Sequence, residues 1–287
     1  MPQFEVPEVD YSRYSNRQLM GPPVAMVVIA VLVISAVFAT TGSPVALGTE
    51  FTGGTELRVV VPGDGTAVTE PFSAAVESVQ PVQQSADTFI LTFGPEAEPE
   101  TIRTQALDAG YDVISVQSTS PAFAASTQRL AVYGVGIAFV GMSIVVFALF
   151  RTVIPSGAVV FSAFGDIAVP VAVMNVLGID LSLGTVAALL MLIGYSVDSD
   201  ILLTNHVLRR SGGFYESVRR AMRTGVTMTV TSISAMAVMA MVATYFRIEL
   251  LSAIGTVLVL GLMTDLVITY MFNVSLLRWY KYEGVSQ

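Results

Sequence analysis

The chain has 287 residues, of which 53% are hydrophobic and only 13% are charged, and its mean hydropathy is +0.70. Soluble domains carry about 25% charged residues, so this composition indicates a membrane protein. The net charge of −8, with Lys281 as the only lysine, argues against nucleic-acid binding, while the lack of cysteine excludes disulfides and a single histidine argues against a His-rich metal centre.

Six apolar runs are long enough to cross a bilayer as helices, which takes about 20 residues each. They cover residues 22–41, 130–150, 154–177, 183–207, 225–246 and 250–277. The sequence therefore predicts an N-terminal segment, a first membrane helix, a long connecting domain, five further membrane helices and a C-terminal segment. Their bounds are 1–21, 22–41, 42–128, 129–278 and 279–287.

The placement of basic residues predicts the orientation of these helices, because cytoplasmic loops carry more arginine and lysine. With six crossings both termini lie on one side. That side receives Arg13, Arg17, Arg151, Arg209, Arg210, Arg219, Arg220, Arg223, Arg278 and Lys281. The other side receives only Arg58, Arg103, Arg129 and Arg247. We therefore expect a multi-pass protein of the cell membrane with both termini in the cytoplasm.

The domain at 42–128 then lies outside, and it is acidic, with eleven Asp or Glu against two Arg. Its pattern predicts strands and helices in alternation. In chain order these are a strand at 55–61, a "PGDG" turn at 62–65, a helix at 67–79, a hairpin of 81–86 with 87–93, a helix at 95–110 and a strand at 111–121. The order β-α-β-β-α-β is typical of a ferredoxin-like α+β domain.

Four carboxylates fall within the predicted membrane helices: Asp166, Asp198, Asp200 and Asp265. Each costs roughly 2.5–3.5 kcal/mol at the bilayer centre, so such residues often mark ion pathways. For Asp166 and Asp265 the alternative stays open that they reach the headgroups or only join neighbouring helices. Asp198 and Asp200 lie roughly 12–15 Å before the basic edge at Arg209, near the midplane, which favours an ion-carrying role.

Helical spacing separates the last two carboxylates, because residues two apart point about 200° away from each other. Unless the helix is distorted near Gly194 and Ser196, one carboxyl faces its own six-helix unit and the other faces a partner. His206 follows about two turns after Asp198 and is either a proton relay or an anchor at the membrane interface. Arg223 is either a cytoplasmic positive residue or a charge partner for a carboxylate.

Several motifs resemble the SecF family of the SecD–SecF protein-export complex. "LGTEFTGGTEL", which contains Phe51, Thr52, Gly53 and Gly54, resembles a signature that follows the first helix of that family. "IGYSVDSDILL" resembles its fourth-helix signature, "RAMRTGVTMT" resembles the start of its fifth helix, and "FGDIAVP" lies where the family often has a His-Asp pair. The motifs occur in the family's order, and the resemblance covers essentially the whole chain.

The resemblance implies a fold and a set of partners. The fold is an α-helical membrane protein with six transmembrane helices, half of a resistance-nodulation-division-type unit, plus the external ferredoxin-like domain. The implied function is an accessory subunit of the Sec translocase that uses an ion gradient to promote polypeptide export, without a cofactor. The implied partners are SecD, which supplies the second six helices, the protein-conducting Sec channel and the translocating polypeptide.

The chain also departs from the bacterial pattern. Ser199 occupies the usual fourth-helix aspartate position, with Asp198 and Asp200 on either side, and this "VDSD" arrangement resembles the archaeal branch. Because Asp198 matches the aspartate of the SecD version, we assign ion coupling to Asp198 first and Asp200 second. Arg223 carries over as the charge partner, and Asp166 and His206 complete the set. Either a proton or a sodium ion is compatible with these residues.

Two other functional classes remain as alternatives. A small-molecule efflux half-unit shares the expected fold, although that class has twelve helices and two large external domains in one chain. A passive structural subunit would use its carboxylates only to join helices. The sequence contains no nucleophile elbow, phosphate-binding loop or metal-ligand spacing, so we do not expect an enzyme.

Overall fold

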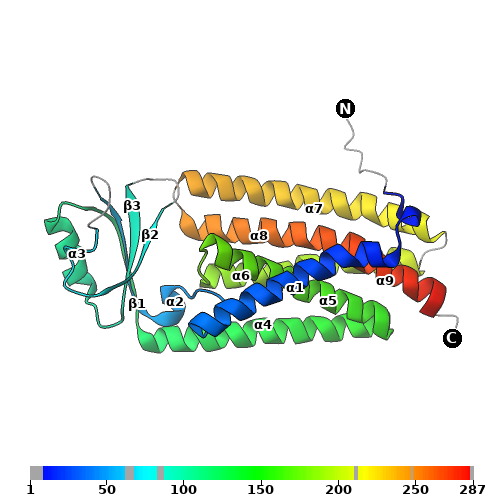
Figure 1. Cartoon of the computed structure of the whole chain (residues 1–287), viewed down its shortest axis with the longest axis horizontal. Helices are drawn as coiled ribbons and strands as arrows, with labels where there is room; N and C mark the ends of the chain where they lie inside the picture. The colour runs from blue at the N-terminus through cyan, green and yellow to red at the C-terminus, as the bar shows by residue number, and fades with distance from the viewer. Residues whose placement is uncertain (1–8, 62–67, 83–86, 210–212, 247, 285–287) are drawn as a thin grey trace. The chain divides into compact units, whose positions relative to one another are not determined.

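The computed structural model describes residues 9–61, 68–82, 87–209, 213–246 and 248–284 (Figure 1). The chain divides into two compact units. One comprises Met1–Ala46 and Gly134–Gln287, and the other comprises Leu47–Tyr133. We call them the membrane unit and the α+β unit.

In the described part of the chain, six helical stretches are long and apolar enough to cross a membrane, as expected. They are α1 (Asn16–Thr41), α4 (Pro121–Phe150), α5 (Val153–Leu177), α6 (Leu183–Arg209), α7 (Phe214–Tyr245), and a last stretch made of α8 (Glu249–Val267), η2 (Ile268–Asn273), α9 (Val274–Trp279) and η3 (Tyr280–Gly284). Several helices begin before the apolar runs do. The fifth begins at Phe214 rather than 225, because its polar first turns continue the same helix.

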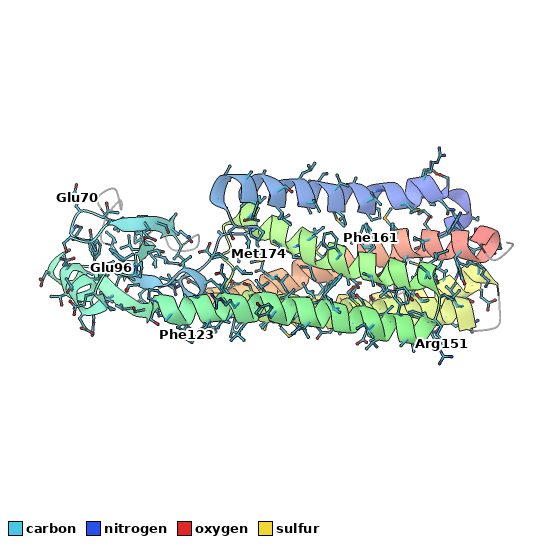
Figure 2. The ribbon with its side chains drawn as sticks, turned by 90° about the horizontal axis from the view of Figure 1, so that it is seen from below. Glu70, Glu96, Phe123, Arg151, Phe161 and Met174 are labelled. Carbon is cyan, nitrogen blue, oxygen red and sulfur yellow. The ribbon has the colours of Figure 1, made fainter. Side chains whose placement is uncertain are left out.

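The six stretches differ in how much of their apolar surface the chain itself buries. In the most apolar window of α5, α6 and the last stretch, 61%, 56% and 44% of residues are buried, against 11%, 6% and 11% for α1, α4 and α7. Figure 2 shows Phe161 and Met174 along α5, with Phe123 and Arg151 near opposite ends of α4. Helices α5 and α6 and the last stretch therefore form the interior of the membrane unit, and most apolar side chains of α1, α4 and α7 face lipid or a partner.

Small residues let the interior helices approach closely. A side chain at Gly165 of α5 would collide with Ile268 of η2, and one at Gly261 of α8 would collide with Leu192 of α6. Such small-residue contacts are typical of membrane helix packing. They hold α5, α6 and the last stretch together close to Asp166 and Asp265.

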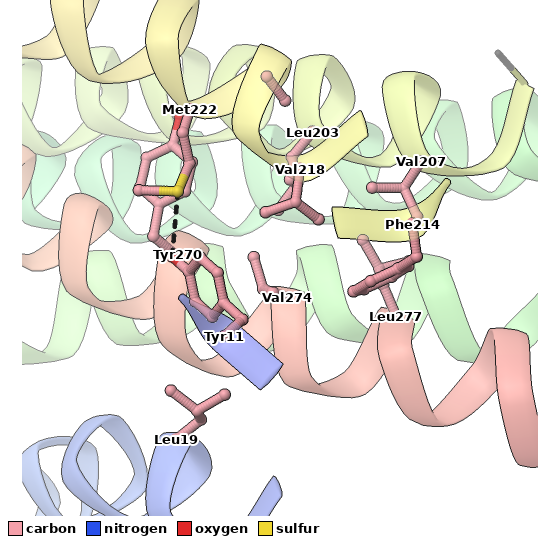
Figure 3. Packing of buried hydrophobic residues seen from close by; sticks show 11 residues of the cluster. Tyr11, Leu19, Leu203, Val207, Phe214, Val218, Met222, Tyr270, Val274 and Leu277 are labelled. Carbon is pink, nitrogen blue, oxygen red and sulfur yellow. Dashed lines mark hydrogen bonds between the residues drawn. The ribbon is translucent and has the colours of Figure 1, made fainter. Parts of the chain in front are cut away.

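The N-terminal segment is hydrogen-bonded to the C-terminal part of the chain. A short 3-10 helix, η1 (Tyr11–Arg13), precedes α1, and Tyr11 packs with α6, α7 and the last stretch and donates to the sulfur of Met222 at 3.2 Å (Figure 3). Burial raises the pKa of the Tyr11 phenol, which keeps it a neutral donor. The Arg278 guanidinium donates to the carbonyls of Tyr11 and Tyr14 at 2.9 and 3.0 Å and to Asn16 Oδ1 at 2.6 Å.

The α+β unit contains a four-stranded antiparallel sheet, the helix α3 (Pro99–Asp108) and the first turns of α4. The strands are β1 (Gly54–Val60), β2 (Val76–Pro81), β3 (Thr88–Phe93) and β4 (Asp112–Thr119), in the order β2-β3-β1-β4. In the register, Leu57 lies opposite Leu91 of β3 and Val116 of β4. Leu57, Leu91 and Phe93 are buried with Ile102 of α3, so the helix covers the apolar face of the sheet.

The helix predicted at 67–79 is wrong. Residues 68–75 form turns and bends, and Val76 already begins β2, whose side chains alternate between half-buried and exposed. Pro71 lacks the N–H that a helix interior needs. Val68 and Phe72 are buried in the core although they are not on a helix, and the centroid of the Phe72 ring lies 5.0 Å from that of Phe93, edge-on. The predicted turn at 62–65 lies outside the described residues, as does most of the predicted strand at 81–86.

A two-glycine turn leads into the first strand. Thr49–Thr52 forms a single helical turn, α2, which Gly53 ends with φ +79°, and Gly54 follows with φ +119°. Phe51 is buried, whereas Thr52 is exposed. Residues other than glycine rarely adopt these φ values, so the change of chain direction from α2 into β1 requires both glycines.

Candidate functional site

Three carboxylates are buried together inside the membrane unit. Asp166 comes from α5, Asp200 from α6 and Asp265 from α8, and they are 1%, 0% and 2% exposed. They belong to the three membrane-spanning stretches whose surface the chain buries most. Serine, threonine and asparagine side chains surround them, so the carboxylates lie in a polar cluster within the membrane unit.

Thr269 joins two of these carboxylates. Its hydroxyl oxygen lies 2.8 Å from Asp200 Oδ1 and 3.0 Å from Asp265 Oδ1. Asn273 donates its amide to the same Asp200 oxygen. On the other side, the Ser199 hydroxyl lies 2.8 and 3.0 Å from the two oxygens of Asp265. Asp200 and Asp265 are therefore parts of one hydrogen-bonded group.

Asp166 is hydrogen-bonded to α6, the helix that also carries Ser199 and Asp200. Ser196 of α6 donates to Asp166 Oδ2 at 2.6 Å, and Ser162 of α5 lies 3.5 Å from that oxygen. Ser196, Ser199 and Asp200 are spaced three and four residues apart, so one face of α6 presents all three to its neighbours. The cluster is therefore formed by the face of α6 that carries Ser196, Ser199 and Asp200, and Asp198 lies on a different face.

A change of helix type supplies the donors to Asp200. Thr269 and Asn273 both lie in η2, a π-helical segment within the last membrane stretch. Each π turn holds more residues than an α turn, and such segments often occur at functional sites. Here the segment carries two donors to one carboxylate.

No cation compensates this group within the described part of the chain. The side-chain hydrogen bonds of Asp166, Asp200 and Asp265 to described residues are all with hydroxyl and amide groups. In this group, three buried acceptor atoms have no donor among the described residues: Asp166 Oδ1, Asp200 Oδ2 and Asn273 Oδ1. Buried ionised carboxylates without a partner cost several kcal/mol or more, so the group favours binding a positive charge. Among the described residues, no set of three His, Cys, Asp or Glu is placed to hold a metal ion.

The structure separates the residues that the sequence nominated. Asp166 and Asp200 come together, whereas Asp198 is exposed on another face of α6 and Arg223 is exposed on α7. His206 is buried, but its Nδ1 lies 2.8 Å from the carbonyl oxygen of Leu202 on its own helix. Phe51, Thr52, Gly53 and Gly54 belong to the α+β unit.

Sequence reasoning left Asp265 out of the site, together with Ser162, Ser196, Thr269 and Asn273. Asp265, Thr269 and Asn273 recur at four-residue intervals in the last membrane helix. A polar stripe of that period on an apolar helix was the signal available in the sequence.

Comparisons with known proteins agree with this architecture. The family described as protein export membrane protein SecD/SecF, C-terminal, matches residues 101–283. Protein-export membrane protein SecF of Haloferax volcanii is 58% identical over 288 residues, and that of Haloquadratum walsbyi is 60% identical over 292, each match covering 100% of both chains. SecF of Methanocaldococcus jannaschii is 37% identical and is covered over 94% of its length, with 91% of this chain.

The fold is similar to the crystal structure of SecDF, a translocon-associated membrane protein from Thermus thermophilus, with a TM-score of 0.72 at 18% identity. That match covers 96% of this chain and 39% of the longer SecDF chain. At this identity the likeness concerns the fold, whereas the curated relatives establish descent. The chain belongs to the SecF family of protein-export membrane proteins.

Proposed function

We propose that the chain is an accessory subunit of the Sec protein translocase that works with SecD and uses an ion gradient to promote export of polypeptides across or into the membrane. The observation that carries this proposal is the uncompensated cluster of Asp166, Asp200 and Asp265. Each buried carboxylate costs roughly 2.5–3.5 kcal/mol at the bilayer centre, and ion pathways are the common reason for that cost.

A partner with further membrane helices is part of the proposal. The apolar faces of α4 and α7 are largely exposed, and the same chain exposes Asp198 on α6 and Arg223 on α7. Charged side chains facing lipid are costly, so a protein surface with polar groups suits these two better. We propose SecD as this partner. The SecDF chain is longer, and the match to this chain covers only 39% of it.

The α+β unit is proposed to lie outside the cell membrane and to contact the emerging polypeptide, while both termini lie in the cytoplasm. The bias of basic residues toward the terminal side supports this orientation. The Sec channel is then a neighbour of the complex.

Single-cysteine labelling checks the orientation, and the natural chain needs no cysteine removed first. Ala75 and Tyr14 are exposed positions in the α+β unit and the N-terminal segment. In intact cells, Ala75→Cys is expected to react with a membrane-impermeant maleimide and Tyr14→Cys to remain unlabelled; permeabilised cells, in which both react, are the control. Labelling of Tyr14→Cys in intact cells would contradict the proposed orientation.

Export driven by an ion gradient tests the function itself. Membrane vesicles containing the Sec channel, SecD and this chain are expected to complete translocation of a stalled secretory protein faster when a proton or sodium gradient is imposed. Vesicles without this chain are the control. An equal rate with and without both gradients would favour a passive structural subunit, and gradient-driven expulsion of small hydrophobic molecules would favour an efflux half-unit.

A further inference from the structure

We propose that Asp200 and Asp265 hold one exchangeable proton between them, with the Thr269 hydroxyl as the bridge along which it moves. The inference deepens the proposed function and rests on it for its meaning in export. It identifies the site inside this chain and adds Asp265 and Thr269, which lie on the last membrane stretch.

The first step is a count of hydrogens at Thr269. A threonine hydroxyl has one hydrogen to donate and can also accept. Thr269 Oγ1 lies within hydrogen-bond distance of a carboxyl oxygen of both Asp200 and Asp265. If both acids were ionised, one contact would bring two acceptors together without a hydrogen. A proton on one carboxyl satisfies both contacts, because that acid donates to Thr269 and Thr269 donates to the other.

The second step concerns the atoms around the pair. Asn273 is 2% exposed, and its amide nitrogen bonds to Asp200 Oδ1, yet its own Oδ1 has no donor. Asp200 Oδ2 also lacks a donor. A site with more buried acceptors than donors lacks hydrogens, and a proton on the pair reduces that deficit.

The third step is the surrounding charge. The titratable groups nearest the pair are Asp166 on α5, which bonds to Ser196 and Ser162, and Tyr270 on η2, whose hydroxyl is buried without a partner. Tyr11 from η1 bonds instead to Met222. His206 on α6 bonds to its own helix. Since none of these contacts brings a cation to the pair, a proton is the positive charge that the described residues accommodate.

The transfer itself is balanced. The Asp265 O–H bond breaks as a new bond forms to Thr269 Oγ1, and the original Thr269 O–H bond breaks as its hydrogen bonds to Asp200 Oδ1. The negative charge moves from Asp200 to Asp265 while Thr269 stays neutral. Because Asp200 belongs to α6 and Asp265 to α8, the transfer shifts charge from one packed helix to another.

Infrared spectroscopy of the full chain in lipid nanodiscs tests the shared proton. The carbonyl band of protonated carboxyl groups is recorded at neutral pH for the native chain and for D200N, D265N and D166N. When either acid is replaced by asparagine, Thr269 can donate its single hydrogen to the carboxylate that remains, so the contacts at Thr269 no longer require a shared proton. We therefore expect D200N and D265N each to lose the same one-carboxyl share of the band. Loss in only one of them, or no protonated carboxyl in the native chain, would overturn the proposal.

The bridge is tested by replacing Thr269, with Thr229→Val as the matched control, since Thr229 is a buried threonine on α7 that bonds only to its own helix. Thr269→Val removes the hydroxyl and is expected to lower gradient-driven export by about a hundredfold, the lower end of the effect of losing a proton-transfer group. Thr269→Ser keeps the hydroxyl and is expected to stay within about twofold of the native rate. Equal export by the Val and Ser variants would overturn the bridge.

The two readouts separate this inference from the proposed function. A shared band in a chain whose export ignores every gradient would leave the proton site standing and end the proposed coupling. Ionised Asp200 and Asp265 in a chain whose export follows the gradient would do the reverse.

Discussion

Asp200→Asn is expected to abolish the gradient-dependent part of export while leaving the chain folded and assembled. Asparagine has nearly the same shape, and its carbonyl oxygen still accepts from Thr269 and Asn273. It cannot, however, take up or release a proton. The stimulated rate should fall to the rate without a gradient, at least about tenfold where stimulation is that large.

Stability measurements distinguish this outcome from misfolding. Replacing a buried charge that lacks a cation by a neutral group is often neutral or stabilising, so thermal unfolding of the purified variant should occur at or above the native temperature. A variant that unfolds early and loses export would point to carboxylates that only join helices.

Asp198→Asn is the matched comparison, because it lies on the same helix but is exposed on the membrane unit. If both variants lose gradient dependence, the exposed carboxylate also takes part, through the partner surface. If Asp198→Asn loses it and Asp200→Asn keeps it, the assignment made from the "VDSD" pattern holds and the role proposed for the buried cluster is wrong.

Gly54→Ala is expected to destabilise the α+β unit strongly. Gly54 has φ +119°, and an added Cβ would collide with the backbone carbonyl oxygen of Phe93 on the paired strand β3. A backbone atom held in a sheet cannot move aside as a flexible side chain can. Strain of this kind costs about 1–3 kcal/mol, and the collision adds to it.

Gly110→Ala is the control, since Gly110 also has a positive φ, +79°, but has open space where the Cβ would be placed. It should cost about 1–2 kcal/mol, the penalty for a left-handed residue alone. Protease resistance of the α+β unit in the full chain, measured against denaturant, gives both values. Equal losses would mean that β1 and β3 separate easily at Gly54.

The helices and their number could be predicted because hydropathy acts along the chain, residue by residue. The runs at 22–41 and 154–177 fall within α1 and α5 for this reason. The helix at 67–79 could not be excluded in the same way. Val68 and Phe72 are spaced as on a helix face, but they are buried by contacts with Phe93 and its neighbours, which only the folded sheet provides.

The carboxylates were visible in the sequence, but their grouping was not. Spacing separated Asp198 from Asp200 correctly, yet nothing along α6 indicates which of the two faces α5 and α8. That depends on the rotation of α6, which is set by contacts such as that of Leu192 with Gly261. The π-helical turn that brings Thr269 and Asn273 to Asp200 is likewise marked by no residue propensity in the sequence.

The link between Arg278 and the backbone of Tyr11 and Tyr14 has a consequence for biosynthesis. A ribosome completes α1 long before it completes α9, so the first helix must wait in the membrane through the synthesis of nearly the entire chain. Only when residue 278 has emerged can the N-terminal segment find its final partners. The last helical turns to be synthesised therefore complete the packing of the N-terminal segment. In a chain released before residue 278, this segment would lack the hydrogen bonds from Arg278.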